Sequence, residues 1–101
     1  MSTQEKIKQQ IAEHPVLLYM KGNASMPLCG FSAQAVKILK SCNVPFTTID
    51  VLQDEDIRQG IKIHSNWPTI PQLYIKGEFI GGSDIMEEMY HAGELQPLLS
   101  A

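Results

Sequence analysis

Positive charge is scarce in this sequence, and arginine is the scarcest of the charged residues. Eight Lys and Arg residues face eleven Asp and Glu residues, which leaves a formal net charge of −3 at pH 7, and Arg58 is the only arginine. A protein that binds nucleic acid irrespective of sequence needs a basic face to displace counterions from phosphate. The composition therefore argues against nucleic acid as a partner.

Long hydrophobic runs are also missing. The longest unbroken apolar run covers residues 16–20, whereas a membrane-spanning helix needs about 20 apolar residues. The first ten residues are mostly polar and include Glu5, which is unlike a signal peptide or a transit sequence. We therefore expect no membrane partner and a location in the reducing cytoplasm.

Cysteine occurs only twice, at Cys29 and Cys42. A cytosolic chain uses cysteine for reactivity or metal binding more often than for a disulfide. If both cysteines lie on one helix, their separation along the chain amounts to roughly 20 Å at ~1.5 Å per residue, whereas bridged Cα atoms lie within about 7 Å. We expect no disulfide between them, and no His or Cys spacing resembles a zinc site.

The 101 residues, 44% of them hydrophobic, predict a single domain over residues 1–101. Helical patterns cover residues 2–14, 29–42, 54–63 and 84–99, the last interrupted at Gly93, and strand patterns cover 16–20, 46–51, 72–75 and 78–80. The first two strands form a right-handed βαβ unit with the helix between them, and the last two form a hairpin. The sequence predicts an α/β fold, a four-stranded mixed sheet flanked by helices on both faces.

Cys29 follows a loop over residues 21–28 and begins a predicted helix. Unpaired N–H groups and the dipole at a helix start favour an anion, so a thiolate there has a lowered pKa and is reactive near neutral pH. Lys21, at the end of the preceding strand, adds positive charge nearby. A buried structural cysteine is the alternative, but the coincidence of Pro27, Gly30 and a helix start favours the reactive one.

Ser32 occupies the place at which a dithiol redox protein carries its second cysteine. A serine cannot resolve a disulfide, so whatever forms on Cys29 is resolved by an outside thiol or is not a disulfide. Ser32 also fits a first-turn residue that bonds to the backbone. The missing resolving cysteine is informative in either case.

Ile70-Pro71, just before the hairpin, is a candidate cis peptide. A cis bond would turn the backbone of Ile70 towards Cys29 and offer its N–H and C=O groups to a bound peptide. A trans turn before a strand is the commoner arrangement in general. The placement before the hairpin favours the cis form.

Gly81-Gly82 leads into a second junction between a loop and a helix. The N–H groups of Ser83 and Asp84 can hold a carboxylate there, and the Asp84 side chain can pair with an amine. Asp84 equally fits a helix N-cap. Arg58 suits a grip on a carboxylate as well as a solvated surface position.

These motifs, taken in order, resemble those of the monothiol glutaredoxins of the Cys-Gly-Phe-Ser type, which have a thioredoxin-like fold. The resemblance covers nearly the whole chain. Four motifs in this order are specific, whereas any one alone is weak. They are Met20-Lys21-Gly22, Cys29-Gly30-Phe31-Ser32, Trp67-Pro68-Thr69 with Pro71, and Gly81-Gly82 with Asp84.

The resemblance implies a glutathione site. Lys21 and Arg58 would hold the glycine carboxylate of glutathione. Thr69, Ile70 and Pro71 would border the tripeptide, with Ile70 pairing with its cysteinyl backbone, and Ser83 with Asp84 would bind its γ-glutamyl end. The family often has cysteine where this chain has Ser83, so a redox role for that second cysteine is excluded here, while the backbone contacts should survive.

The resemblance also implies a [2Fe–2S] cluster, with Cys29 as both redox thiol and iron ligand. Such a cluster needs four donors, most often thiolates, and one chain offers only Cys29 at the site. Two chains and two glutathione thiols would complete the set. This predicts a cluster-bridged homodimer that dissociates into monomers when apo.

The implied function is delivery of a labile [2Fe–2S] cluster to recipient apoproteins, with BolA-like proteins able to replace one subunit. The chain is then a carrier rather than an enzyme, with at most weak glutathione-dependent oxidoreductase activity. The alternative makes that activity the main function: Cys29 removes glutathione from mixed disulfides. A redox-regulated interaction module is a third possibility, which the full glutathione site disfavours. The inserted loop at residues 22–28 favours the carrier, because a longer approach would hold glutathione at a poor angle for exchange.

Overall fold

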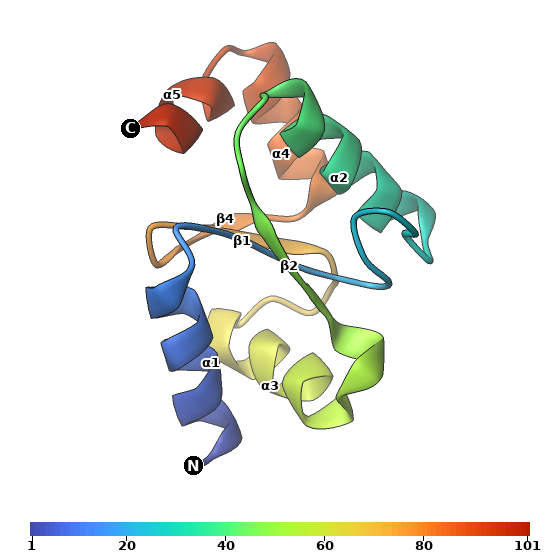
Figure 1. Ribbon diagram of the computed structural model, residues 1–101, viewed down its shortest axis with the longest axis vertical. Coiled ribbons are helices and arrows are strands. Elements are labelled where there is room, and N and C mark those ends of the chain that lie inside the picture. Colours follow the sequence, from blue (N-terminus) through green and yellow to red (C-terminus); the bar gives the residue numbers. More distant parts are fainter.

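A four-stranded sheet forms the centre of the computed structural model, which describes residues 1–101 (Figure 1). Its strands are β1 (Val16–Met20), β2 (Thr47–Asp50), β3 (Gln72–Ile75) and β4 (Glu78–Gly81), in the order β2-β1-β3-β4. β1 pairs with β2 in parallel and with β3 antiparallel, and β3 pairs antiparallel with β4. The predicted mixed sheet is confirmed.

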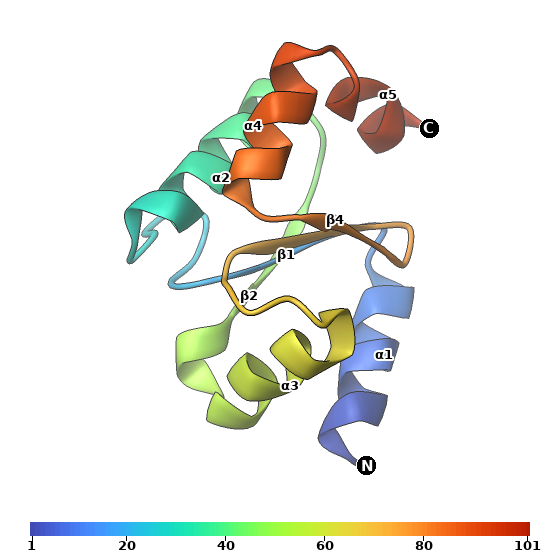
Figure 2. The ribbon, with the colours of Figure 1, turned by 180° about the vertical axis from the view of Figure 1, so that it is seen from behind.

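Helices cover both faces of this sheet (Figures 1 and 2). α1 (Thr3–Glu13) and α3 (Glu55–Ser65) lie on one face, and α2 (Gly30–Ser41), α4 (Ser83–His91) and α5 (Leu95–Ser100) lie on the other. None of these helices is both long and apolar enough to cross a membrane.

The core has two halves because the side chains of a strand point alternately to its two faces. In β1, Leu17 and Tyr19 belong to the half between the sheet and helices α1 and α3. Leu18 and Met20 belong to the half between the sheet and helices α2 and α4. All five residues of β1 are buried, as a central strand covered on both faces requires.

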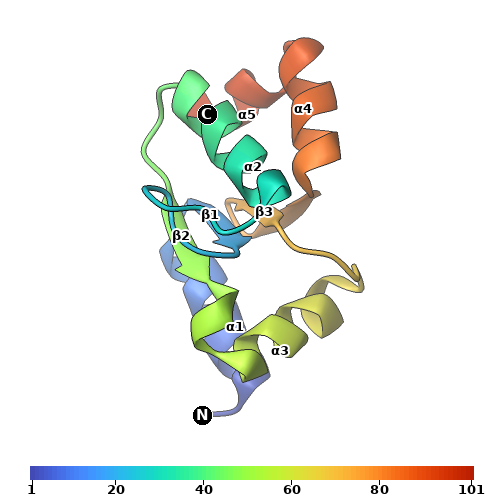
Figure 3. The same cartoon turned by 90° about the vertical axis from the view of Figure 1, so that its right-hand side faces the viewer.

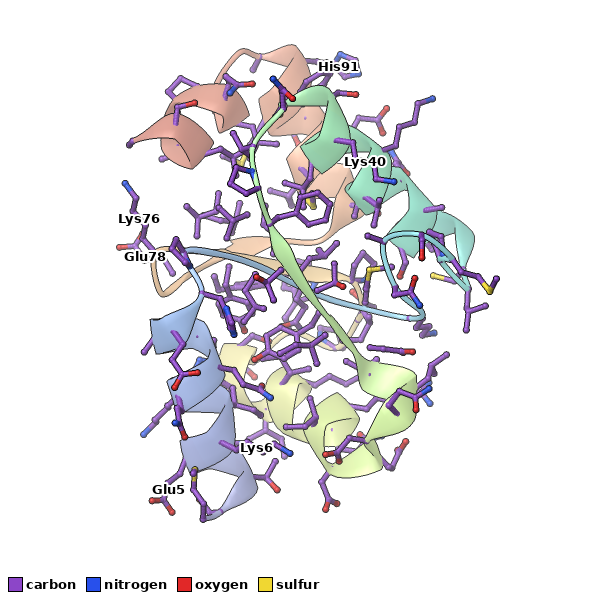
Figure 4. The ribbon with its side chains drawn as sticks, in the orientation of Figure 1. Glu5, Lys6, Lys40, Lys76, Glu78 and His91 are labelled. Atoms are coloured by element: carbon purple, nitrogen blue, oxygen red, sulfur yellow. The ribbon has the colours of Figure 1, made fainter.

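The start of α1 is held by the predicted capping box. The Ser2 hydroxyl accepts the Glu5 N–H at 3.1 Å, and the Glu5 carboxylate accepts the Ser2 N–H at 3.2 Å. Lys6, labelled with Glu5 in Figure 4, extends from the same helix to the carboxylate of Asp54 at 3.4 Å. Asp54 is the N-cap of α3, so this ion pair joins the two helices on that face.

The hairpin turns at Lys76-Gly77, as predicted. Both residues have positive φ, 50° and 85°, which is the requirement of the two-residue turn that matches the twist of the flanking strands. Figure 4 labels Lys76 and Glu78 at this turn.

Most element ends differ from the predicted ones by a residue or two, and two segments also change their type or division. The strand expected over residues 46–51 ends at Asp50, and a short 3₁₀ helix, η1 (Val51–Gln53), follows it. The Asp50 carboxylate accepts the N–H groups of Leu52 at 2.9 Å and Gly22 at 3.0 Å. It therefore caps η1 and ties the loop after β1 to the end of β2. The segment after Gly93 forms the separate helix α5.

Candidate functional site

Cys29 is the N-cap of α2, where its Sγ accepts the N–H of Ser32 at 3.3 Å. The Ser32 hydroxyl is fully buried and lies 3.3 Å from the same sulfur. That hydroxyl already accepts the N–H of Lys21 at 3.1 Å. Its own hydrogen is therefore free to be donated to the sulfur, which favours the thiolate.

The pKa of Cys29 follows from these contacts. Partial burial raises the pKa of the thiol, but hydrogen bonds from the Ser32 hydroxyl and from the N–H groups of Ser32 and Phe31, with the charge of Lys21, outweigh it. The pKa of Cys29 therefore lies below its ordinary value, as predicted. Cys42 caps the other end of α2, where burial raises the pKa of its thiol. Both cysteines are free thiols.

A cleft of about 410 Å³ lies beside this thiol, between α3 and the start of α4. Figure 3 shows the segment from α3 to β3, which forms its middle, passing between the two helical layers. The lining residues are Lys21, Phe31, Arg58, Lys62, Trp67, Pro68, Thr69, Ile70, Pro71, Gly82, Ser83, Asp84 and Ile85.

Seven of the eight predicted site residues therefore meet in one cleft. Cys29 does not line it. The sulfur is adjacent to it, because Lys21 and Phe31 both line the cleft and both act on the thiol. No group of three or more His, Cys, Asp or Glu side chains in the chain is arranged to hold a metal ion.

The charges of the cleft are mostly positive. The lining includes three basic residues, Lys21, Arg58 and Lys62, and one acidic residue, Asp84. The guanidinium of Arg58 lies 3.8 Å from Glu55, and its Nε is buried without any hydrogen-bond partner. The cleft therefore suits an anionic ligand.

Lys62 is a site residue that the sequence reasoning missed. It lies four positions after Arg58 in α3, and residues four apart share one face of a helix. This spacing from Arg58 is the signal in the sequence that points to Lys62.

The start of α4 corrects one prediction. Gly82, not Asp84, is the N-cap, and no side chain caps this helix. A Cβ at Gly82 would lie 3.2 Å from the carbonyl oxygen of Pro71, so the cap position is pressed against the opposite wall of the cleft. Asp84 lies in the first turn and lines the cleft, where a helix start leaves backbone N–H groups unpaired.

The Ile70-Pro71 peptide is cis, as favoured from the sequence. Ile70 lines the cleft although only 8% of the residue is exposed, because its side chain packs in the core. Thr69, just before it, is exposed.

A single thiol of lowered pKa at a helix start, beside a mostly cationic cleft on a mixed four-stranded sheet, is the arrangement of a thioredoxin-like thiol protein. The sequence model described as Glutaredoxin matches residues 16–80. Glutaredoxin 4 of Haemophilus influenzae is 56% identical over 100 residues, which are 99% of this chain and 94% of that protein. A Synechocystis protein named an uncharacterized monothiol glutaredoxin, ycf64-like, is 56% identical over 97 residues, 96% of this chain and 91% of that one. The chain belongs to the glutaredoxin family, and its one cysteine in Cys29-Gly30-Phe31-Ser32 makes it a monothiol member.

Solved structures agree with the fold. The solution structure of reduced apo GrxS14 from poplar has a TM-score of 0.84 and 48% identity, covering 96% of this chain and 89% of that one. The crystal structure of a buckwheat glutaredoxin–glutathione complex has a TM-score of 0.86 and 25% identity, covering 97% and 87%. The predicted thioredoxin-like fold of the glutaredoxins is confirmed.

Proposed function

We propose that the cleft binds glutathione with the thiol of the tripeptide next to Cys29. Glutathione carries two carboxylates and one amine along a short peptide backbone. The cleft offers cations on its α3 side and a helix start with one carboxylate on its α4 side. The pattern of charges on the ligand thus matches the pattern on the walls, and the related buckwheat protein is a glutathione complex.

Each part of the tripeptide has an assigned partner in this proposal. Lys21 and Arg58 hold the glycine carboxylate, and the backbone of Ile70, beside Thr69 and Pro71, pairs with the cysteinyl residue. The γ-glutamyl end lies at the start of α4, against Ser83 and Asp84. The unpartnered Nε of Arg58 supports this assignment, because a buried donor without a partner is costly and a carboxylate accepts well from a guanidinium.

The main function in this proposal is to carry a [2Fe–2S] cluster. A cluster with four thiolate ligands takes Cys29 from each of two chains and one glutathione thiol held by each chain. Cys29 is ready for this role because its pKa is lowered and it is partly exposed. The neighbouring Met26, Leu28 and Phe31 are each more than half exposed and give a second copy an apolar surface. Recipient apoproteins in the cytoplasm then take the cluster, and a BolA-like protein can replace one subunit.

Anaerobic reconstitution with iron, sulfide and glutathione tests this function. We expect a coloured dimer by absorbance and size-exclusion chromatography, formed only when glutathione is present, and transfer of its cluster to an apo-ferredoxin. Cys29→Ser should abolish assembly, and Cys42→Ser, at the far end of the same helix, should leave it intact. An iron-loaded monomer that forms without glutathione would contradict the proposal.

The lowered pKa of Cys29 also favours a second candidate, a glutathione-dependent oxidoreductase. The Cys29 thiolate attacks the glutathionyl sulfur of a protein mixed disulfide, which breaks the old S–S bond and releases the protein thiolate to take a proton from water. A second glutathione thiolate then attacks the glutathionyl sulfur on Cys29, releasing glutathione disulfide and the Cys29 thiolate. Fast turnover of a glutathionylated peptide, with no stable cluster, would place this function first.

A further inference from the structure

Gln72 is a polar side chain in the interior, fully buried at the first position of β3. Its Nε2 donates to the carbonyl oxygens of Trp67 at 3.1 Å and Thr69 at 3.2 Å. Its Oε1 accepts the hydroxyl of Tyr74 at 3.1 Å. Both ends of this buried amide therefore have partners, as burial of a polar group requires.

The two carbonyls that Gln72 holds belong to the wall of the cleft. Residues 67–69 all line the cleft and are all exposed, so side-chain packing holds them only weakly. Trp67, at the start of this segment, makes further contacts. Its N–H donates to the carbonyl oxygen of Lys62 at 3.2 Å and to the hydroxyl of Ser65 at 3.1 Å. The centre of its ring lies 5.9 Å from that of Phe79.

The Thr69 end of the segment depends on Gln72. The bond from Nε2 is the only hydrogen bond that Thr69 makes within the chain. Pro68 and Pro71 on either side lack N–H groups, so they donate none. Gln72 therefore provides the hydrogen-bond anchor for the backbone at residue 69, next to Ile70, whose side chain packs in the core.

We propose that Gln72 is the positioning residue for glutathione: its side-chain amide fixes residues 67–69 so that the Ile70 backbone meets the tripeptide. The proposal rests on the glutathione site proposed above. An amide suits the position because its two hydrogens serve two carbonyls while its oxygen serves the Tyr74 hydroxyl. A carboxylate would face both carbonyls with lone pairs, and an apolar side chain would hold neither.

Gln72→Met tests this role because it keeps the length of the side chain and removes both bonds to the cleft wall. S-methylglutathione is the probe, since it keeps both carboxylates and cannot exchange disulfides. At a temperature where circular dichroism shows a folded protein, we expect the Kd to rise about tenfold, which is the effect of losing about one net hydrogen bond. Trp67, the only tryptophan, should become more accessible to acrylamide quenching.

Two control variants separate positioning from general stability. Tyr74→Phe keeps the ring and both bonds from Gln72 to the carbonyls, so the Kd should stay within about twofold and the quenching should not change. Leu99→Ala removes apolar contacts in the other half of the core, far from the cleft. It should lower the melting temperature and leave the Kd and the quenching as in the wild type.

A folded Gln72→Met protein with wild-type Kd and wild-type quenching would overturn the proposal. If that variant does not fold, hydrogen exchange of the Gln72 side chain in the wild-type protein tests the proposal. The side-chain amide protons of Gln72 should exchange with D₂O far more slowly than those of the exposed Gln53, and equal rates would overturn the proposal. A wild-type protein that does not bind S-methylglutathione would instead refute the proposed site, while quenching of Trp67 would still report on Gln72.

Discussion

Replacing Arg58 with glutamine removes a guanidinium from the cleft and leaves a polar side chain on α3. This change should alter the stability of the free protein only slightly. The Arg58 side chain is 33% exposed, and the carboxylate of Glu55 lies 3.8 Å away in an exposed helical pair, which contributes only about 0.3–0.5 kcal/mol. The unfolding free energy should therefore change by less than about 1 kcal/mol.

The change should reduce the binding free energy of glutathione much more. A hydrogen bond between a charged donor and a carboxylate contributes about 1.5–3 kcal/mol, and the buried Nε has no partner to give up before it binds. Arg58→Gln should therefore weaken the affinity for glutathione by a factor of about 10–100. Because the site is partly exposed, added salt should narrow the difference from the wild type.

Calorimetric titration with S-methylglutathione measures this loss. Lys37→Gln is the matched control, because it removes one positive charge from an exposed position of α2 outside the cleft. We expect its Kd to stay within about twofold of the wild type. An Arg58→Gln protein whose Kd is also within that range would refute the assignment of Arg58 to the glycine carboxylate.

Further variants test the thiol and the backbone beside it. Ser32→Ala removes the hydroxyl that faces the Cys29 sulfur at 3.3 Å, so the pKa of Cys29 should rise and alkylation by iodoacetamide at pH 7 should slow roughly 3- to 10-fold; an unchanged midpoint of the rate against pH would contradict this. Because the pKa of Cys29 is lowered in the folded protein, the thiolate stabilises the fold, so the unfolding free energy of the wild type relative to Cys29→Ser should increase as the pH rises towards about 8.5. A difference that shrank over that range would show that the sulfur is not stabilised as a thiolate. Gly81→Ala should destabilise by about 3 kcal/mol in chemical denaturation, since φ is +151° and a Cβ would lie 2.7 Å from that of Ile85. Gly30→Ala, with nothing within 4 Å of the added Cβ, should stay within about 0.5 kcal/mol of the wild type, and equal losses would show that Gly81 has no special role.

The features that the sequence predicts well are local or periodic. The sheet, the helices on both faces and the hairpin follow from apolar patterns and turn residues that lie close together in the chain. The lowered pKa of Cys29 follows in the same way, because the groups that favour the thiolate are mainly its neighbours in α2. Lys62 was within reach of the same reasoning, through its helical spacing from Arg58.

The features that escaped prediction depend on contacts that follow no regular spacing along the sequence. Gly82 is the N-cap of α4 in place of Asp84, and the opposite wall of the cleft, at Pro71, approaches it closely. The role of Gln72 depends on the carbonyl groups of Trp67 and Thr69, which lie in the irregular segment just before β3. Neither contact leaves a periodic signal in the sequence, so each required the folded chain.

Native mass spectrometry of the anaerobically reconstituted protein tests most directly whether Cys29 is half of a shared site. Two chains, one [2Fe–2S] cluster and two glutathione molecules are the expected composition, and dialysis that removes glutathione should return apo monomers. A cluster bound to a single chain, or to two chains without glutathione, would contradict the shared site.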